Sequence, residues 1–126
     1  MIHLDTHVVA WLYAGELDLV PWDVREILAR EELAVSPMVI LELDCLKEIG
    51  RITTAGKVIV DDLSLRLGLA ISQTSLAAIV PYASKQSWTR DPFDRIIVGH
   101  AVADGSRLVT ADRTILENFK DAVWGT

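Results

Sequence analysis

Short apolar runs alternate along the chain with longer stretches in which apolar residues recur every three or four positions. Such short runs are typical of strands buried on both faces of a sheet, and such stretches are typical of helices with one buried side. Strands are predicted at residues 1–4, 33–36, 69–72 and 107–110, with a possible edge strand at 122–124. Helices are predicted at residues 5–15, 22–32, 37–50, 53–68, 75–86, 91–105 and 112–119. This alternation favours an α/β fold with a mostly parallel sheet and helices on both faces.

Residues that begin and end helices refine these bounds. Thr6 is predicted to be the N-cap of the first helix, and Ser36 followed by Pro37 opens another. Pro81 is expected to interrupt the helix at 75–86. Asp91 and Pro92 have the pattern of an N-cap and a first helical residue.

Composition restricts the class of protein. The chain has 126 residues, of which 51% are hydrophobic, which suits one domain spanning 1–126 and argues against disorder. The longest uncharged run, 67–84, contains five polar or proline positions and is too polar for a membrane span. The first residues lack the pattern of a signal peptide, and Cys45 is the only cysteine. We therefore expect a cytoplasmic protein without a disulfide.

The net charge of −6 bears on the choice of partner. A protein that held nucleic acid by bulk electrostatics would be basic. Either the partner is another protein, or a local site with bound divalent cations overrides the overall charge.

Four carboxylates are predicted to meet at one edge of the sheet. Asp5 follows the first strand, and Asp112 comes two residues after the fourth strand. Asp94 lies in the first turn of its helix and Glu42 in the second turn of another, both near the carboxyl ends of the strands. In parallel α/β folds, ligands bind at that edge.

A structural explanation competes with this one. Asp91 would cap its helix with Asp94 as the capping-box partner three residues later, and Asp112 would cap the helix from Arg113. Taken singly, each aspartate fits a cap better than a catalytic role. Glu42 does not, because its helical neighbours are apolar, and a half-buried carboxylate there requires a cation or a proton.

Clustered carboxylates suit hard cations such as Mg²⁺ or Mn²⁺, which prefer oxygen ligands. No His or Cys spacing indicates zinc, and the sequence contains neither a glycine-rich phosphate loop nor a GxSxG nucleophile elbow. A bound metal would remove the repulsion between the acids, activate water and stabilise charge on a phosphate.

Three stretches, "LDTHVVAWL", "VSPMVILEL" and "RDPFDRIIVGHAVADGSRLVTAD", resemble the PIN domain, and within it the VapC-like toxins of type II toxin–antitoxin pairs. The resemblance covers essentially the whole chain, and the last stretch is the most specific. It implies a three-layer α/β/α sandwich and a ribonuclease that depends on Mg²⁺ or Mn²⁺. It also implies a homodimer and an antitoxin whose tail covers the site.

The resemblance carries over residue by residue. The conserved acids of the family fall on Asp5, Glu42, Asp94 and Asp112, and Asp91 matches an extra acid of the toxin subgroup. We expect Asp5 and Asp94 to be the main metal ligands, with Glu42 and Asp112 acting through water or a second metal. The expected reaction is hydrolysis of an RNA phosphodiester.

Other polar residues near the acids are weaker candidates. Thr110 matches a hydroxyl position beside the acids of the family, and Thr6 follows Asp5 directly. Arg95 contacts either phosphate or an acid, or forms a surface ion pair. His7 favours a structural role at the helix start.

His100 is expected to be a core or interface residue, and no role is assigned to His3. The aromatic segment from Trp11 to Trp22 is expected to be mostly core and is a candidate contact for an antitoxin or a second copy.

Three alternatives remain open at this point. A signalling receiver domain also gathers acids around Mg²⁺, but it requires a phosphoacceptor aspartate after the third strand and a lysine after a late strand, and neither is present. The others are an inert binding module of the same fold and a PIN nuclease that works in RNA processing without an antitoxin.

Overall fold

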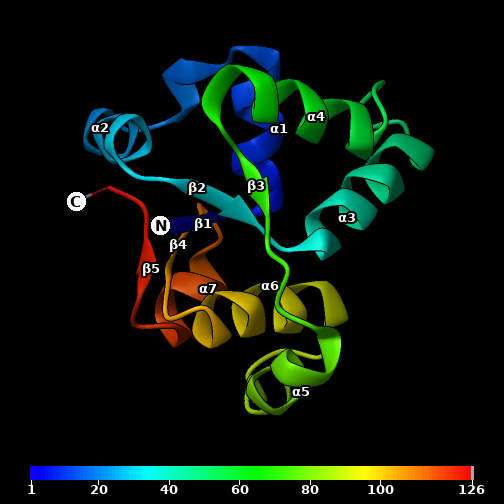
Figure 1. Cartoon of the computed structure of the whole chain (residues 1–126), viewed down its shortest axis with the longest axis vertical. Helices are drawn as coiled ribbons and strands as arrows, with labels where there is room; N and C mark the ends of the chain where they lie inside the picture. The colour runs from blue at the N-terminus through cyan, green and yellow to red at the C-terminus, as the bar shows by residue number, and fades with distance from the viewer. Residues whose placement is uncertain (126) are drawn as a thin grey trace.

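Five short strands form one parallel sheet in the computed structural model, which describes residues 1–125 (Figure 1). The strands are β1 (Ile2–Leu4), β2 (Leu33–Val35), β3 (Ala70–Ile71), β4 (Arg107–Val109) and β5 (Ala122–Val123). The order across the sheet is β3-β2-β1-β4-β5, and every neighbouring pair is parallel. Each predicted strand is present, although each is shorter than its apolar run.

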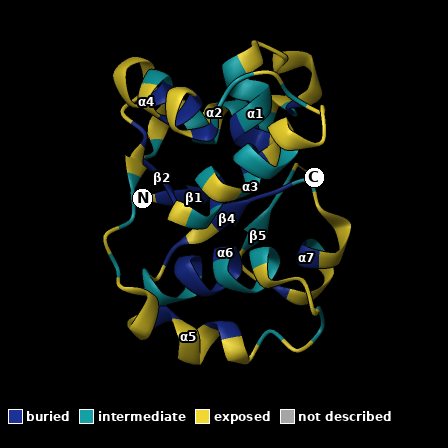
Figure 2. Ribbon diagram, turned by 90° about the vertical axis from the view of Figure 1, so that its right-hand side faces the viewer, coloured by how far each residue is buried: buried dark blue, intermediate teal, exposed yellow. Residues whose placement is uncertain are grey.

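Helices cover both faces of this sheet, so the α/β/α sandwich is confirmed (Figure 2). The layer on one face contains α1 (Thr6–Ala14), α2 (Trp22–Arg30) and α4 (Gly56–Leu67). On the other face lie α6 (Pro92–Ala103) and α7 (Arg113–Asn118), with α5 (Leu76–Ser84) packed outside α6. The remaining helix, α3 (Pro37–Glu48), contacts α1, α4 and α6, and a short 3-10 turn, η1 (Leu17–Leu19), precedes α2.

The core forms because the strands are apolar on both sides. Ile2, Leu4, Val35, Leu108 and Val109 are almost fully buried between the two helix layers. At the centre of the sheet, β1 pairs with β4 in the register Leu4 with Val109. The chain passes from β1 to β2 on one side and from β4 to β5 on the other, so the sheet has a switch point between β1 and β4.

Two predictions about helix ends are wrong. The N-cap of α1 is Asp5, whose side chain accepts a hydrogen bond from the Thr6 N–H, so Thr6 is already inside the helix. Pro81 lies within α5 and does not interrupt it. A proline that removes only one backbone hydrogen bond is tolerated here because Pro81 is exposed and water can reach the freed carbonyl.

The packing of α4 against α3 depends on Gly56. A Cβ atom at this position would lie only 2.4 Å from the Ile40 carbonyl oxygen, so only glycine allows the two helices to approach this closely. The Gly56 N–H donates to Asp44 Oδ1 at 2.8 Å, which takes the place of a side-chain cap at the start of α4. Helix α3 is thereby fixed against the layer above the sheet.

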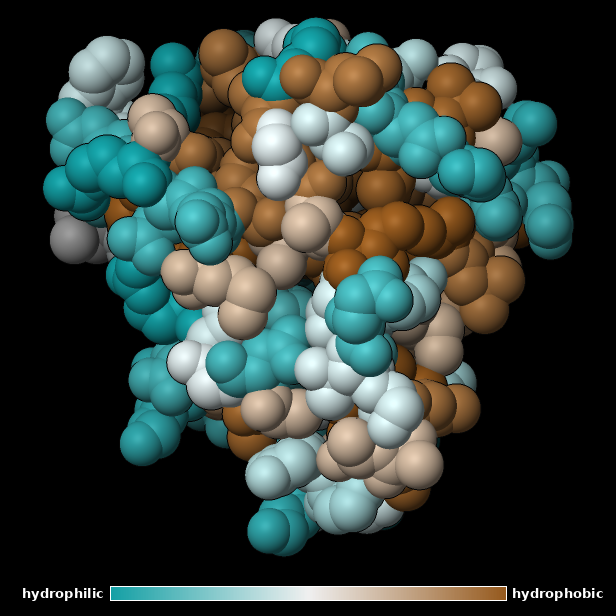
Figure 3. Space-filling view, viewed as in Figure 1, coloured by the Kyte–Doolittle hydropathy of each residue, from teal (hydrophilic) through white to brown (hydrophobic). Residues whose placement is uncertain are grey.

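Apolar side chains also reach the surface on this side of the molecule, where brown areas lie over α3 and α4 (Figure 3). Ile49, Val58 and Leu65 are among the exposed ones. In the stretch from residue 1 to 125, no helix has both the length and the apolar character needed to cross a membrane.

Candidate active site

Asp5 lies at the switch point of the sheet, directly after β1. Its backbone N–H donates to the Val109 carbonyl at 2.9 Å, which continues the pairing of β1 with β4 by one residue. Its Oδ1 accepts from the Thr6 N–H at 2.8 Å, and its Oδ2 accepts from the Thr110 hydroxyl at 2.6 Å. The residue is 7% exposed, and burial raises the pKa of its carboxyl group although both hydrogen bonds act to lower it. Two hydrogen bonds therefore hold the Asp5 carboxyl group at a position where burial disfavours its charged form.

Thr110 connects Asp5 to Asp112 through its hydroxyl group. This fully buried residue follows β4, and its hydroxyl accepts a hydrogen bond from the Asp112 N–H at 3.0 Å. Asp112 is the N-cap of α7, where its Oδ1 accepts from the Thr114 N–H at 2.8 Å. The capping role predicted for Asp112 is confirmed, and that role also fixes its position beside Asp5.

Glu42 reaches the same region from α3. Its Oε1 accepts a hydrogen bond from the hydroxyl of Thr6, the residue after Asp5. Glu42 is half-buried, and burial raises its pKa, with further contributions from the negative charges of Asp5 and Asp91. The hydroxyl of Thr6 therefore joins Glu42 to the start of α1.

Asp91 and Asp94 occupy the start of α6, but they do not form a capping box. The Asp91 side chain caps the helix by accepting from the Phe93 N–H at 2.8 Å. The Asp91 N–H, which Asp94 would have to satisfy, donates instead to the Thr89 hydroxyl at 3.1 Å. The predicted capping partnership of Asp94 is therefore wrong, and its carboxylate is free to take part in the site.

Asp94 is electrostatically coupled to the other acids. Burial raises its pKa to about 7, and Asp91, Asp112, Asp5 and Glu42 all contribute by repulsion. These charges come from β1, α3, α6 and the segment after β4, and they meet at the edge where parallel α/β folds bind ligands. The structure thus brings together all four acids that the sequence singled out.

This donor set fits a hard cation. All the donors are oxygens, and burial together with repulsion between the acids raises the pKa values of Asp5, Glu42 and Asp94, so a bound cation would stabilise the ionised cluster. Within residues 1–125, no three His, Cys, Asp or Glu side chains are arranged to hold one metal ion directly. Mg²⁺ commonly binds through one or two carboxylates and keeps several waters, so it does not require a closed cage of side chains.

His7 and Arg95, which follow Asp5 and Asp94 in the sequence, have different relations to the acids. His7 is exposed, and its charge opposes the rise in the pKa of Asp5 and Glu42. Arg95 donates from Nε to the Thr89 carbonyl at 2.8 Å and forms no ion pair with an acid of the described chain. Arg95 therefore helps to hold the loop before α6, and its guanidinium leaves the charge of the acids uncompensated.

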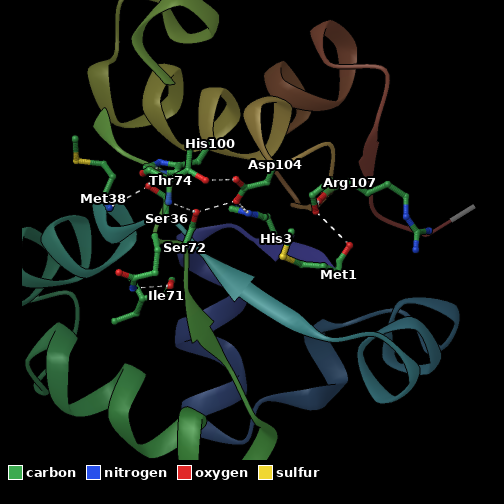
Figure 4. Close-up of polar contacts among 12 residues, drawn as sticks. Met1, His3, Ser36, Met38, Ile71, Ser72, Thr74, His100, Asp104 and Arg107 are labelled. Carbon is green, nitrogen blue, oxygen red and sulfur yellow. Dashed lines mark hydrogen bonds and ion pairs between the residues drawn. The ribbon is translucent and has the colours of Figure 1, made fainter. Parts of the chain in front are cut away.

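A second polar cluster, which the sequence reasoning missed, lies between the sheet and α6 (Figure 4). Asp104, at the end of α6, accepts from His3 Nε2 at 2.7 Å, from the Ser72 hydroxyl at 2.8 Å and from the Thr74 hydroxyl. Burial alone would raise the pKa of Asp104, but these three hydrogen bonds together lower it. We call His3, Ser72, Thr74 and Asp104 the Asp104 network.

The protonation of His3 follows from these contacts. Because a carboxylate only accepts, Nε2 of the neutral ring carries the proton, and Nδ1 is buried with no partner in the described residues. Burial lowers the pKa of His3, since a second proton on Nδ1 would be desolvated and unpaired.

His100 extends this network toward the acid cluster. Its Nε2 lies 3.2 Å from the Thr74 carbonyl, and its Nδ1 lies 2.7 Å from the Ser36 hydroxyl. The carbonyl only accepts, so Nε2 donates and Nδ1 accepts from Ser36. Ser36 also caps α3 by accepting from the Met38 N–H at 3.1 Å. The prediction that His100 is a satisfied core residue is confirmed, and His100 helps to place the helix that carries Glu42.

Parallel α/β folds bind ligands at the switch point of the sheet, and in this protein that point carries the acid cluster. The PIN domain family matches residues 2–121, and the chain belongs to that family, whose members are nucleases. A receiver domain is excluded because that fold has the strand order 2-1-3-4-5.

Solved structures with the same fold agree with the family assignment. VapBC2 from Rickettsia felis, bound to a DNA fragment from their promoter, matches with a TM-score of 0.67 and 20% identity, over 98% of this chain and 99% of that chain. A toxin–antitoxin complex from Klebsiella pneumoniae matches with a TM-score of 0.62 and 15% identity, over 98% of this chain and 96% of that chain. No curated protein matched the chain.

Proposed function

We propose that this protein is a ribonuclease dependent on Mg²⁺ or Mn²⁺, and that it is the toxin of a type II toxin–antitoxin pair. The observation that carries the nuclease proposal is the placement of Asp5, Glu42, Asp94 and Asp112 around the switch point of the sheet, where burial and the neighbouring acids raise the pKa of Asp94 to about 7. A cluster with this much uncompensated negative charge suits a divalent cation, and the PIN family consists of nucleases.

In this proposal, Asp5 and Asp94 are the main metal ligands, and Glu42 and Asp112 complete the site through water or a second ion. When bound, the metal lowers the pKa of a water molecule and stabilises negative charge on the phosphate. Thr110 and Thr6 hold Asp5 and Glu42 in position by their hydroxyl hydrogen bonds. Asp94 has no hydrogen-bond donor of its own among the contacts described, so it adjusts most readily to a cation and loses its proton when one binds.

The toxin role rests on the likeness to two toxin–antitoxin complexes, both of which cover nearly the whole chain. The proposed partner is an antitoxin whose tail covers the acid cluster, and the proposed assembly is a homodimer. The net charge of −6 is compatible with this role because a basic side chain of an antitoxin would be attracted to the acids.

The nuclease proposal is tested by incubating the purified protein with a mixed-sequence RNA, with Mg²⁺ or with a chelator. We expect cleavage with Mg²⁺ by the wild-type protein and none by Asp5→Asn or Asp94→Asn. Wild-type rates from either variant would rule out the proposed mechanism.

The toxin proposal has a separate test, which is expression of the protein alone in a bacterial host. Growth arrest that requires Asp94, and that is relieved by co-expressing the small protein of the adjacent reading frame, is the expected result. A nuclease that cleaves RNA in vitro but leaves growth unaffected would favour a role in RNA processing without an antitoxin.

A further inference from the structure

An open cleft of about 470 Å³ lies beside the acid cluster, at the same edge of the sheet. Its walls include Ala111 and Arg113, which flank Asp112, and Trp124, which follows β5. Pro21 and Leu116 add apolar surface, and Asp23 adds a carboxylate. We call it the Trp124 cleft. The cleft contains none of the four acids, so it is a neighbour of the candidate active site and not the same site.

The ring of Trp124 is held in place by other aromatic side chains. Trp11 of α1 packs against it with ring centroids 5.8 Å apart, and His7 packs against Trp11 at 6.1 Å. His7 lies two residues after Asp5, so this row of three rings connects the cleft to the candidate metal ligand. Both tryptophans are only half-buried, so the row reaches the surface.

The chemistry of the cleft matches an unpaired nucleotide. Trp124 offers a flat face on which a base can stack, and stacking of this kind does not depend on base identity. The exposed Arg113 offers a cation for the phosphate that follows the base. Asp23 offers an acceptor for the N–H groups on the edge of a base, and Pro21 offers an apolar surface.

The negative net charge of the protein also favours a site that binds RNA by base stacking. A protein with a net charge of −6 gains little affinity for RNA from bulk electrostatics. Affinity must then come from local contacts, and base stacking is a contact that the negative charge of the protein does not oppose. A stacked base beside Asp112 would also hold the adjoining phosphate close to the acids.

We infer that the Trp124 cleft is a subsite that stacks one unpaired RNA base next to the cleaved phosphate, with Trp124 as the stacking face and Arg113 as the phosphate contact. This inference rests on the proposed ribonuclease function. It deepens that proposal by assigning side chains of this chain to substrate recognition.

The test is binding of a short fluorescent single-stranded RNA of mixed sequence, measured by anisotropy at low salt without divalent ions, so that cleavage does not interfere. Trp124→Leu keeps apolar packing but removes the aromatic face, and we expect it to weaken binding roughly tenfold. Trp124→Phe keeps an aromatic face and should bind within about twofold of the wild type. The midpoint of thermal unfolding of each variant shows whether it is folded.

Two further variants sharpen the test. Arg113→Ala changes an exposed side chain and should reduce the dependence of binding on salt concentration, since it removes a phosphate contact. Tyr82→Leu is the matched control, because Tyr82 on α5 also lies next to a cation, Lys85, but outside the cleft. It should bind like the wild type. With Mg²⁺, Trp124→Leu should raise the KM for cleavage and leave kcat nearly unchanged.

The inference and the proposed function fail in different ways. If the wild type cleaves RNA but Trp124→Leu binds RNA as tightly as Trp124→Phe and the wild type do, the nuclease proposal stands and the base subsite is wrong. If Trp124→Leu binds RNA normally but no longer associates with the protein of the adjacent reading frame, the cleft belongs to a protein partner, and the inference is also wrong. If the wild type neither binds nor cleaves RNA, both proposals fail together.

Discussion

Two clusters built around partly buried carboxylates, Asp94 and Asp104, have opposite electrostatics in this protein. At the carboxyl edge of the sheet, Asp94 faces four other acids and has a pKa raised to about 7. Between the sheet and α6, Asp104 accepts hydrogen bonds from His3 and two hydroxyl groups, and its pKa is lowered. Asp94 has no hydrogen-bond donor among the contacts described, whereas both oxygens of Asp104 accept hydrogen bonds.

The difference separates a site that needs a ligand from a network that does not. Buried acids with a full set of donors stabilise a fold, because each hydrogen bond to a charge contributes to the free energy of unfolding. Buried acids that face one another destabilise it unless a cation is bound. The acid cluster therefore has the energetic signature of a functional site, and the Asp104 network has that of a structural one.

The largest expected effect is on activity, and it should be confined to one group. Asp5→Asn removes a proposed metal ligand and should reduce RNA cleavage by roughly a hundredfold or more. Asp104→Asn should leave kcat within about twofold of the wild type at a temperature where the variant is folded. Both rates are measured with Mg²⁺ on the same RNA. An equal loss of activity in the two variants would remove the distinction between the groups.

The reverse pattern is expected for stability. Asp104→Asn removes the charge that accepts a hydrogen bond from neutral His3 and weakens two further hydrogen bonds, and should lower the free energy of unfolding by about 2–4 kcal/mol. Asp94→Asn removes repulsion and should leave the metal-free protein equally stable or more stable. Urea unfolding in the presence of a chelator measures both. A greater loss of stability from Asp94→Asn than from Asp104→Asn would contradict the comparison.

The pH dependence of stability should differ in sign between the groups. The pKa of Asp94 is higher in the folded than in the unfolded protein, so the folded state holds a proton that the unfolded state releases, and stability falls between about pH 4 and pH 7. The effect is on the order of 2 kcal/mol after allowance for solvent screening.

Asp104 has a lowered pKa, so its contribution is complete above about pH 4 and is lost in more acidic solution. His3 also has a lowered pKa, so protonation of the unfolded chain destabilises the protein below about pH 6.5. The difference between the wild type and Asp94→Asn isolates the contribution of Asp94, and a difference that did not change with pH would show that Asp94 has an ordinary pKa.

The positions of Asp5 and Asp112 could be predicted because parallel strands determine where their ends lie. Once Asp5 and Asp112 were placed after two strands, the fold brought them to one edge. Local sequence did not decide the role of Asp94, because Asp91 and Asp94 have capping-box spacing. Only the structure shows that the Asp91 N–H donates to the Thr89 hydroxyl, which takes the place of the capping-box bond to Asp94.

The Asp104 network was out of reach for a different reason. His3 and Asp104 are 101 positions apart and meet only because β1 passes over the end of α6. Neither residue belongs to a motif, and a histidine within an apolar strand gives no sign of its partner. Pro81 shows a further limit, because a proline can either end a helix or lie within one. Here it lies within α5, where it is exposed and water can reach the carbonyl that loses its backbone donor.

A smaller effect is expected from Thr110, which lies inside the acid cluster. Thr110→Val keeps the shape of the side chain but removes the hydrogen bond to Asp5 and the acceptor for the Asp112 N–H. Metal affinity should fall by roughly tenfold, as is usual when a group that orients a ligand is lost. Calorimetric titration with Mn²⁺ measures this, and Thr110→Ser, which retains the hydroxyl, should restore most of the affinity.

The smallest effect is expected from an exposed ion pair on the protein surface. Lys57 and Asp61 form an exposed ion pair one helical turn apart on α4. Lys57→Ala should change the free energy of unfolding by less than about 0.5 kcal/mol, because exposed pairs are weakened by water and salt. A loss as large as that of Asp104→Asn would show that burial does not strengthen the contacts of a carboxylate in this protein.

Binding of Mn²⁺ or Mg²⁺ to the purified protein, measured by isothermal titration calorimetry near pH 7, tests the central claim most directly. The account predicts binding to the wild type with release of protons, affinity at least about tenfold weaker in Asp94→Asn, and unchanged affinity in Asp104→Asn. A wild-type protein that bound neither ion, or that bound them as tightly after Asp94→Asn, would contradict it.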